Sequence, residues 1–184
     1  MSIKGLEQAI ANLNSISEKA VPRASAQSVN RIAGQAVNRS VSVVSKSTRV
    51  PRKLVKQRAR IRRATVSKPR ALIRVNRGNL PAIKLGTASV RLSRRKRDKL
   101  GASSVLRIGP FRFPGAFIQQ LANGRWHVLR RTTRNRYPIE VVSIPLAVPL
   151  TEAFRAELPR LMDERMPEVM RQNLQNQLRL ILSR

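Results

Sequence analysis

The stretch from Arg52 to Arg136 constrains this chain most, because it concentrates positive charge. It holds 25 of the 38 Lys and Arg residues and a single acid, Asp98, so these 85 residues carry +24 of the formal net charge of +29. Such a block repels itself unless a polyanion, a neighbouring chain or water disperses the charge. We call this stretch the basic belt. Its densest parts supply the candidate contact residues, which are Arg52, Lys53, Lys56, Arg58, Arg60, Arg62, Arg63, Arg94, Arg95, Lys96, Arg97 and Lys99.

The rest of the composition predicts a single domain over residues 1–184. Hydrophobic residues make up 41% of the chain and aromatic residues only 3%, so the core is expected to consist of Val, Ile, Leu and Ala. The absence of Cys excludes disulfides, thiolate nucleophiles and Cys-based zinc sites. No signal peptide pattern is visible, and no window approaches the ~18 apolar residues of a membrane span. We therefore expect a product made in a cytoplasm, without a membrane partner.

Helical periodicity marks the N-terminal region, residues 1–48. The stripe Leu6, Ile10, Leu13 and Ile16 has spacings of four, three and three, which predicts one amphipathic helix. Pro22 either kinks this helix or begins a new one. Beyond it, apolar residues continue at helical spacing and uncharged polar residues fill the other faces. That polar surface fits packing against another subunit or an ordinary exposed face.

A basic segment, residues 49–70, follows a break at Pro51. The run from Arg52 to Arg63 predicts either a short basic helix or an extended arm. Residues 71–144 then alternate between apolar and polar positions, which predicts strands near 71–76, 83–85, 89–93, 104–108 and 139–144. The run from Arg94 to Lys99 predicts a charged loop.

The strongest local signal is the Asn123-Gly124 pair between two arms, residues 116–122 and 125–131. Asn-Gly readily adopts the positive φ angles of a type I′ turn, so this block predicts a β-hairpin. We expect it to serve as a subunit interface through Phe117, Asn123, Gly124, Trp126 and His127.

Residues 150–183 predict a C-terminal helix. Thr151 is a suitable N-cap and Glu152 suits the first turn, while Pro159 and Pro167 should kink or restart the helix. The predicted fold class is α+β, with an N-terminal helix, a predominantly antiparallel sheet of four to six strands with the Asn-Gly hairpin, and a kinked C-terminal helix.

No residue pattern indicates catalysis or a cofactor. His127 is the only histidine, and the chain has no phosphate-binding glycine loop. The acids of the C-terminal helix alternate with Arg residues, which indicates ion pairs on a helix surface rather than paired-carboxylate catalysis. We therefore expect no enzymatic activity, no catalytic residue, no cofactor and no metal site.

The basic belt has two interpretations. The first is a solvated basic face, or positions that meet acidic surfaces of neighbouring subunits. The second is a surface that gains free energy from counterion release on nucleic acid phosphates. The charge exceeds the roughly 2 to 8 that solubility requires in a small domain. Few aromatic residues accompany it, so base stacking is poorly supported and any DNA contact should be independent of sequence.

Motifs in order along the chain resemble the minor tail protein Z of lambda-like phages. They lie at residues 3–9, 52–56, 62–66, 75–78, 83–86, 114–121, 123–128, 135–139 and 144–151. The block from Pro114 to Val128, which includes the Asn-Gly hairpin, is the most specific of them.

The resemblance implies a structural virion component of the tail or neck, assembled in the host cytoplasm. It implies a tail completion protein needed for productive head-to-tail joining and placement of the DNA end. Its expected partners are copies of itself in a hexameric ring, neighbouring tail and neck proteins, and the DNA backbone. The alternative from another class is a free cytoplasmic basic protein that binds nucleic acid without sequence specificity.

Overall fold

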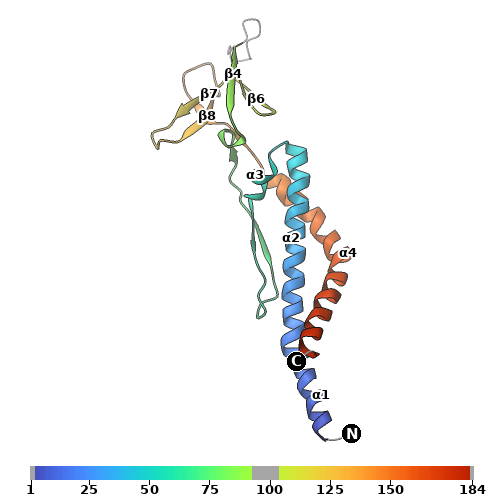
Figure 1. The fold of residues 1–184 in the computed structure, drawn as a ribbon. Helices are drawn as coiled ribbons and strands as arrows, with labels where there is room; N and C mark the ends of the chain where they lie inside the picture. The colour runs from blue at the N-terminus through green and yellow to red at the C-terminus, as the bar shows by residue number, and fades with distance from the viewer. Residues whose placement is uncertain (1–2, 93–103, 183–184) are drawn as a thin grey trace. The chain divides into compact units, whose positions relative to one another are not determined.

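The computed structural model describes residues 3–92 and 104–182, and its helices and strands confirm the α+β class (Figure 1). The chain divides into two compact units that interleave in sequence. A helical unit comprises Met1–Val43, Ala59–Val75 and Leu150–Arg184. A sheet unit comprises Val44–Arg58 and Asn76–Pro149. The predicted loop from Arg94 to Lys99 lies outside the described residues.

The N-terminal region is helical throughout. Helix α1 spans Ile3–Ser15, a π-helical turn spans Ile16–Ala20, and helix α2 spans Val21–Thr48. The amide of Val21 donates to the carbonyl of Ile16, one residue further back than in an α-helix. Pro22 therefore lies in the first turn of α2, where its missing N–H is tolerated, and the wider π turn precedes it. Ser15 and Val21 both keep helical dihedral angles, so the helical backbone continues through Pro22 and does not restart there.

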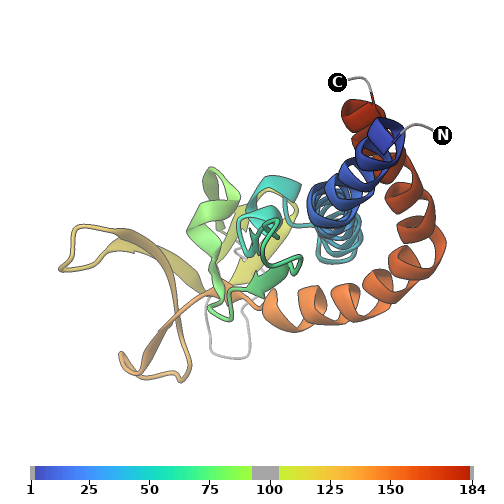
Figure 2. The same cartoon turned by 90° about the horizontal axis from the view of Figure 1, so that it is seen from below.

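Helix α4 spans Ala147–Leu182, so it begins four residues before the predicted cap at Thr151. Pro149 falls in the first turn, where amide groups have no intrahelical partner, and a Pro there does not stop a helix. Pro159 and Pro167 lie within α4 with their side chains exposed, and the helix continues through both of them. Figure 2 shows α4 curving along its length rather than restarting. Carbonyl groups freed by an exposed Pro remain open to water, which explains why the helix survives both.

The core of the helical unit lies between α2 and α4. Ile32 and Ala36 of α2 pack with Leu161 and Val169 of α4, and Ile73 contributes from a strand. Each buried aliphatic side chain contributes about 1.5–3 kcal/mol to folding. Polar links cross the same contact, among them the amide of Asn173, which donates to the hydroxyl of Ser28 at 2.9 Å, and the guanidinium of Arg31, which donates to Gln172 at 3.3 Å.

Four small antiparallel sheets replace the single sheet of four to six strands that the sequence predicted. In the sheet unit they comprise β4-β5-β6, β7-β8-β9 and the pair β10-β3. Gly109 and Gly115 adopt positive φ angles of 54° and 68° at the two ends of β6, and Gly109 lies in the turn that joins β5 to its antiparallel partner β6. The strands of this unit are β3 Leu80–Pro81, β4 Ala88–Leu92, β5 Ser104–Ile108, β6 Phe111–Pro114, β7 Ala116–Gln120, β8 Trp126–Arg131, β9 Ile139–Val141 and β10 Ser143–Ile144.

Two short helices complete the sheet unit. Helix α3 spans Arg52–Lys56, and a 3-10 turn spans Ala82–Leu85, where the sequence predicted an edge strand. Ala82 is fully buried in that turn and packs with Leu106, Ile108, Ala116 and Val128, which together form the core of this unit. The need to bury Ala82 against these strands favours the turn over an exposed edge.

Strands β7 and β8 enclose the Asn123-Gly124 turn, but the turn is not of type I′. Only Gly124 has a positive φ, at 74°, and Asn123 does not. The amide of Leu121 donates to the carbonyl of Arg125, and the amide of Gly124 donates to the carbonyl of Leu121. This is the three-residue hairpin loop in which a type I turn precedes a left-handed glycine. The Asn123 side chain is free to accept from the amide of Arg125 at 3.0 Å.

Candidate nucleic-acid interface

The basic segment continues into a hairpin of the helical unit. Strand β1, Ala59–Arg62, pairs antiparallel with strand β2, Leu72–Val75. We call residues 59–75 the basic hairpin, and they contain six Lys or Arg residues and no acid. The run from Arg52 to Arg63 is therefore neither wholly helix nor wholly arm, since α3 is followed by β1.

The two faces of this hairpin differ in polarity. Ile61 and Ile73 lie opposite each other and are half-buried, with Ile73 packed against the core of α2 and α4. Arg60 and Arg74 are the next cross-strand pair, and both are exposed. Side chains directly opposite in an antiparallel pair lie about 4.5–5.5 Å apart at Cβ, so two like charges there are unfavourable. An anion between the two guanidinium groups would relieve that repulsion.

The start of the hairpin loop is fixed by a residue of α2. The side-chain amide of Asn30 donates to the carbonyl of Ala64 at 2.9 Å and its oxygen accepts from the amide of Ala64 at 2.8 Å. Ala64 is buried at this point. One side chain thus satisfies both backbone groups of Ala64, and holds the charged loop at a defined place on α2.

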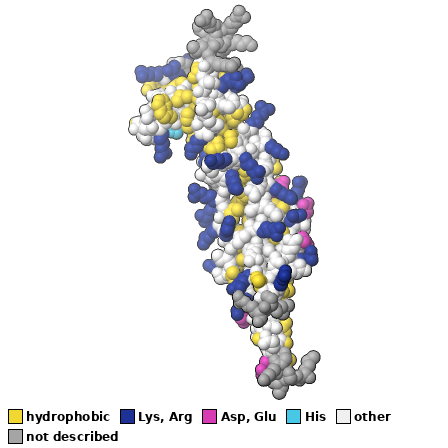
Figure 3. All heavy atoms as spheres, viewed as in Figure 1, with side chains coloured by type: hydrophobic (Ala, Val, Ile, Leu, Met, Phe, Trp, Pro, Cys, Tyr) yellow, Lys and Arg dark blue, Asp and Glu magenta, His cyan; other side chains and the backbone are white. Residues whose placement is uncertain are grey.

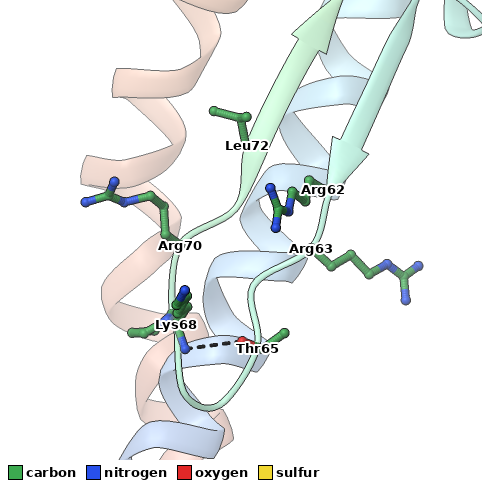
Figure 4. A pocket seen from close by; sticks show the side chains of 7 residues that line it. Arg62, Arg63, Thr65, Lys68, Arg70 and Leu72 are labelled. Atoms are coloured by element: carbon green, nitrogen blue, oxygen red, sulfur yellow. Dashed lines mark hydrogen bonds between the residues drawn. The ribbon is translucent and has the colours of Figure 1, made fainter.

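The loop itself forms a small turn closed by Thr65 and Lys68. Their backbones exchange hydrogen bonds of 3.0 and 3.2 Å, and the amide of Lys68 also donates to the Thr65 hydroxyl. A hollow of about 750 Å³ lies here, and Figure 4 shows Arg62 between the two arms with Arg63 and Arg70 extending outward on opposite sides. The residues around this hollow are Arg62, Arg63, Thr65, Lys68, Pro69, Arg70 and Leu72.

Acidic side chains do not neutralise the basic hairpin in the part of the chain that the structure describes. The ion pairs found there join Arg39 with Glu157, Arg130 with Glu140 and Arg171 with Glu168. Five of the nine acids of the sequence belong to α4. Figure 3 shows Lys and Arg side chains along the hairpin, while most acidic side chains of this unit lie along α4. The hairpin therefore carries exposed positive charge.

The other predicted belt residues occupy the sheet unit or are not described. Arg52, Lys53 and Lys56 are exposed on α3. Arg58 instead has a structural role, because its guanidinium donates to the carbonyl of Asn79 at 3.0 Å. Arg94, Arg95, Lys96, Arg97 and Lys99 lie outside the described residues.

The predicted interface hairpin has one exposed aromatic residue. Trp126 is 56% exposed and lies opposite Gln120, whereas Phe117 is half-buried with the guanidinium of Arg131 5.9 Å from its ring centre. His127 is half-buried opposite Gln119, and its buried Nδ1 has no hydrogen-bond partner within the described structure. Asn123 and Gly124 are exposed at the tip.

Three basic residues of the site were absent from the sequence-based candidates. Lys68 and Arg70 belong to the loop and Arg74 lies opposite Arg60. The signal was present, because residues 71–76 alternate like a strand directly after a run of Arg residues. Pairing that strand with Arg58–Arg63 would have placed Arg74 on the charged face.

The described residues contain no cluster of three or more His, Asp or Glu side chains that could hold a metal ion. No helix among the same residues is long and apolar enough to cross a membrane. What the site offers is a set of guanidinium and ammonium donors, which are suited to phosphate oxygens. The fold and the site define a basic α+β protein with an exposed, positively charged hairpin.

The family is established by similarity over the whole chain. Residues 3–184 match the family of the prophage minor tail protein Z, and the chain belongs to that family. It is 80% identical over 184 residues to the tail completion protein of Escherichia phage N15, with all of both chains covered. It is 55% identical to tail completion protein Z of Escherichia phage lambda, again with both chains fully covered. No solved structure matches. The chain is thus a phage tail protein.

Proposed function

We propose that this chain is a structural tail completion protein at the neck or upper tail, where it forms a ring needed for head-to-tail joining and for placing the DNA end. Two relatives named as tail completion proteins, at 80% and 55% identity over their full length, support the role in completion. The ring is what the resemblance to the family implies, and the DNA contact rests on the chain's own residues.

The observation that carries the DNA contact is the basic hairpin. Its six basic side chains have no acid among them in sequence, and Arg60 faces Arg74 across the strands. Phosphate groups that lie against such a surface release condensed counterions, and this term needs no base recognition. The contact is therefore with the DNA backbone and independent of sequence.

Assembly into a ring would strengthen the argument for a DNA contact. Six copies of the basic belt at +24 each would assemble 144 formal positive charges. Charge of this size around an empty lumen would be strongly unfavourable, and a DNA end within the ring would offset it. The proposal therefore joins the structural role and the DNA contact in one assembly.

Complementation of particles assembled without this protein tests the function. Purified chain should restore head-to-tail joining, seen by electron microscopy, and infectivity, counted as plaques. A hairpin triple variant, with Arg62, Arg63 and Lys68 changed to Gln, should lower infectivity at least a hundredfold. A paired-arginine variant, with Arg39, Arg130 and Arg171 changed to Gln, removes the same charge and should retain most activity.

Two results would contradict this proposal. Failure of the unaltered chain to restore joining would remove the role in completion. Equal infectivity with both triple variants would show that the hairpin is not needed to place the DNA end, whatever the role of the chain in joining.

A further inference from the structure

Helix α1 exposes an apolar stripe that its own chain does not cover. Leu6, Ile10 and Leu13 are 60%, 50% and 64% exposed. Their spacing of four and three residues places them on one side of the helix. A row of large aliphatic side chains this exposed on one helix face is typical of a surface that binds another protein.

The opposite face of α1 is polar and faces inward. Gln8, Ala11, Asn12 and Ser15 line a hollow of about 360 Å³ together with Gln177, Leu180 and Ile181 of α4. Asn12 and Ser15 are half-buried there, although Leu6, Ile10 and Leu13 are exposed. An amphipathic helix normally buries its apolar face. The reversed orientation of α1 means that its own unit does not use the stripe.

The helical unit also carries an open apolar groove of about 550 Å³. Its exposed apolar residues are Leu72 of β2 and Leu158 and Met162 of α4, which are 43%, 37% and 44% exposed. Arg70 and Arg155 are exposed at the same groove. Three elements supply the apolar lining: α2, the strand β2 with the residue before it, and α4.

We propose that the α1 stripe of one copy occupies the α2–β2–α4 groove of a neighbouring copy. Binding of an amphipathic helix in a groove uses anchors at such helical spacing. Glu7, which follows Leu6 and borders the stripe, is one of only nine acids in the chain, and two arginines flank the groove. The charges at the edge of the contact are therefore complementary.

A second copy is the occupant that fits these observations, because one chain supplies both halves of the contact. The stripe and the groove are different surfaces, so the interface is heterologous, and a heterologous contact closes into a ring or continues as a filament. This inference deepens the proposed function and rests on it for the ring, but the contact is testable by itself.

Site-specific disulfide cross-linking tests the contact directly, because the chain contains no Cys and gives no background. One preparation would carry Leu13→Cys and a second Leu158→Cys, and the two would be mixed and mildly oxidised. We expect a covalent dimer that appears only in the mixture. A Gln8→Cys preparation, with its thiol on the opposite face of α1, is the matched control and should give at least tenfold less product with Leu158→Cys.

Other outcomes would overturn the proposal. Dimers formed by Leu13→Cys alone, at the yield of the mixture, would show that stripes pair with stripes. Absence of the mixed dimer, whether the chain is oligomeric or monomeric by light scattering after nuclease treatment, would show that the groove does not receive α1.

A charged substitution in the stripe tests whether the contact is needed for self-association. Ile10→Asp should raise the dissociation constant for self-association at least tenfold, with helicity unchanged by circular dichroism, whereas Gln8→Asp should leave association within twofold. Equal association of the two variants would contradict the contact. If the unaltered chain restores joining of tails but no mixed dimer forms, only the contact fails. If the unaltered chain does not restore joining, the proposed function fails, and the cross-link still decides the contact.

Discussion

The chain contains two hairpins that both carry positive charge but differ in how much of it is paired. In the β7–β8 hairpin, Arg130 is paired with Glu140 of β9 at 2.7 Å and Arg131 lies against the ring of Phe117. In the basic hairpin, Arg60 lies opposite Arg74, and four further basic residues surround the loop hollow beside Thr65. Two of the three arginines in the first hairpin thus have a partner within the fold. The concentration of positive charge makes the second hairpin the better candidate for contact with an anion.

The hairpins also differ in what fixes their loops. A residue from another element, Asn30 of α2, holds the basic hairpin at Ala64. The β7–β8 loop is fixed by its own backbone, through the left-handed conformation of Gly124. Tertiary contact therefore positions the loop of the basic hairpin, whereas local conformation positions the β7–β8 loop.

The largest expected effects come from the cores behind the two hairpins. Leu161→Ala in the helical unit and Leu106→Ala in the sheet unit each remove a fully buried side chain. Each should lower the free energy of unfolding by about 2–5 kcal/mol. Urea denaturation measures this. Equal and small losses, below about 1 kcal/mol, would contradict the burial of these side chains.

Asn30→Ala should have the next largest effect, because it leaves both backbone groups of Ala64 without their partner. The expected loss is about 1–3 kcal/mol in the free energy of unfolding. Hydrogen exchange at the Ala64 amide should accelerate, while exchange at the β7–β8 amides should not change. Unchanged protection of Ala64 would show that Asn30 does not hold the loop.

Gly124→Ala should destabilise the other hairpin by about 1–2 kcal/mol, because an L residue is strained at positive φ. Gly34→Ala is the matched control. Gly34 lies within α2, with open space where a Cβ would be added, so alanine there should stabilise by about 0.5–1 kcal/mol. The opposite signs of the two changes, measured by thermal unfolding, test the conformation of Gly124.

The smallest effect concerns Glu168 on α4, a helix whose acids and arginines balance in number, unlike the basic hairpin. Hydrogen bonds from Arg171 and then Gln172 lower the pKa of Glu168 below its usual 4.5. A carboxyl with a lowered pKa stabilises the fold above its unfolded-state pKa and loses this contribution as the pH falls through its folded-state pKa. In an NMR titration, Arg171→Ala should raise the pKa of Glu168 towards 4.5. No change would mean that the pair does not persist in solution.

Much of the local structure followed from the sequence. Alternation over residues 71–76 predicted β2, the arms around Asn123-Gly124 predicted β7 and β8, and the helical spacing around Val29 predicted α2. These signals are local, since each depends on which face of one element is apolar. The density of positive charge, a separate signal, placed Arg60, Arg62 and Arg63 among the candidate contact residues.

The remainder depends on tertiary contacts that periodicity does not encode. The division of the strands into four sheets depends on which short strand pairs with which. The pairing of Arg60 with Arg74 and the anchor at Asn30 join residues far apart in sequence. The sequence also did not reveal that the apolar stripe of α1 is exposed, because an apolar stripe in a sequence does not show whether its own chain covers it.

The central claim is that the unneutralised basic hairpin, rather than positive charge in general, meets DNA phosphates. Its most direct test is the dependence of double-stranded DNA binding on salt for the unaltered chain and the two triple variants. Each lost phosphate contact lowers the slope of log K against log salt by about 0.9, so the hairpin triple variant should lose about three units of slope. The paired-arginine variant, equal in charge, should lose less than about one. Identical slopes for the two variants would contradict the claim.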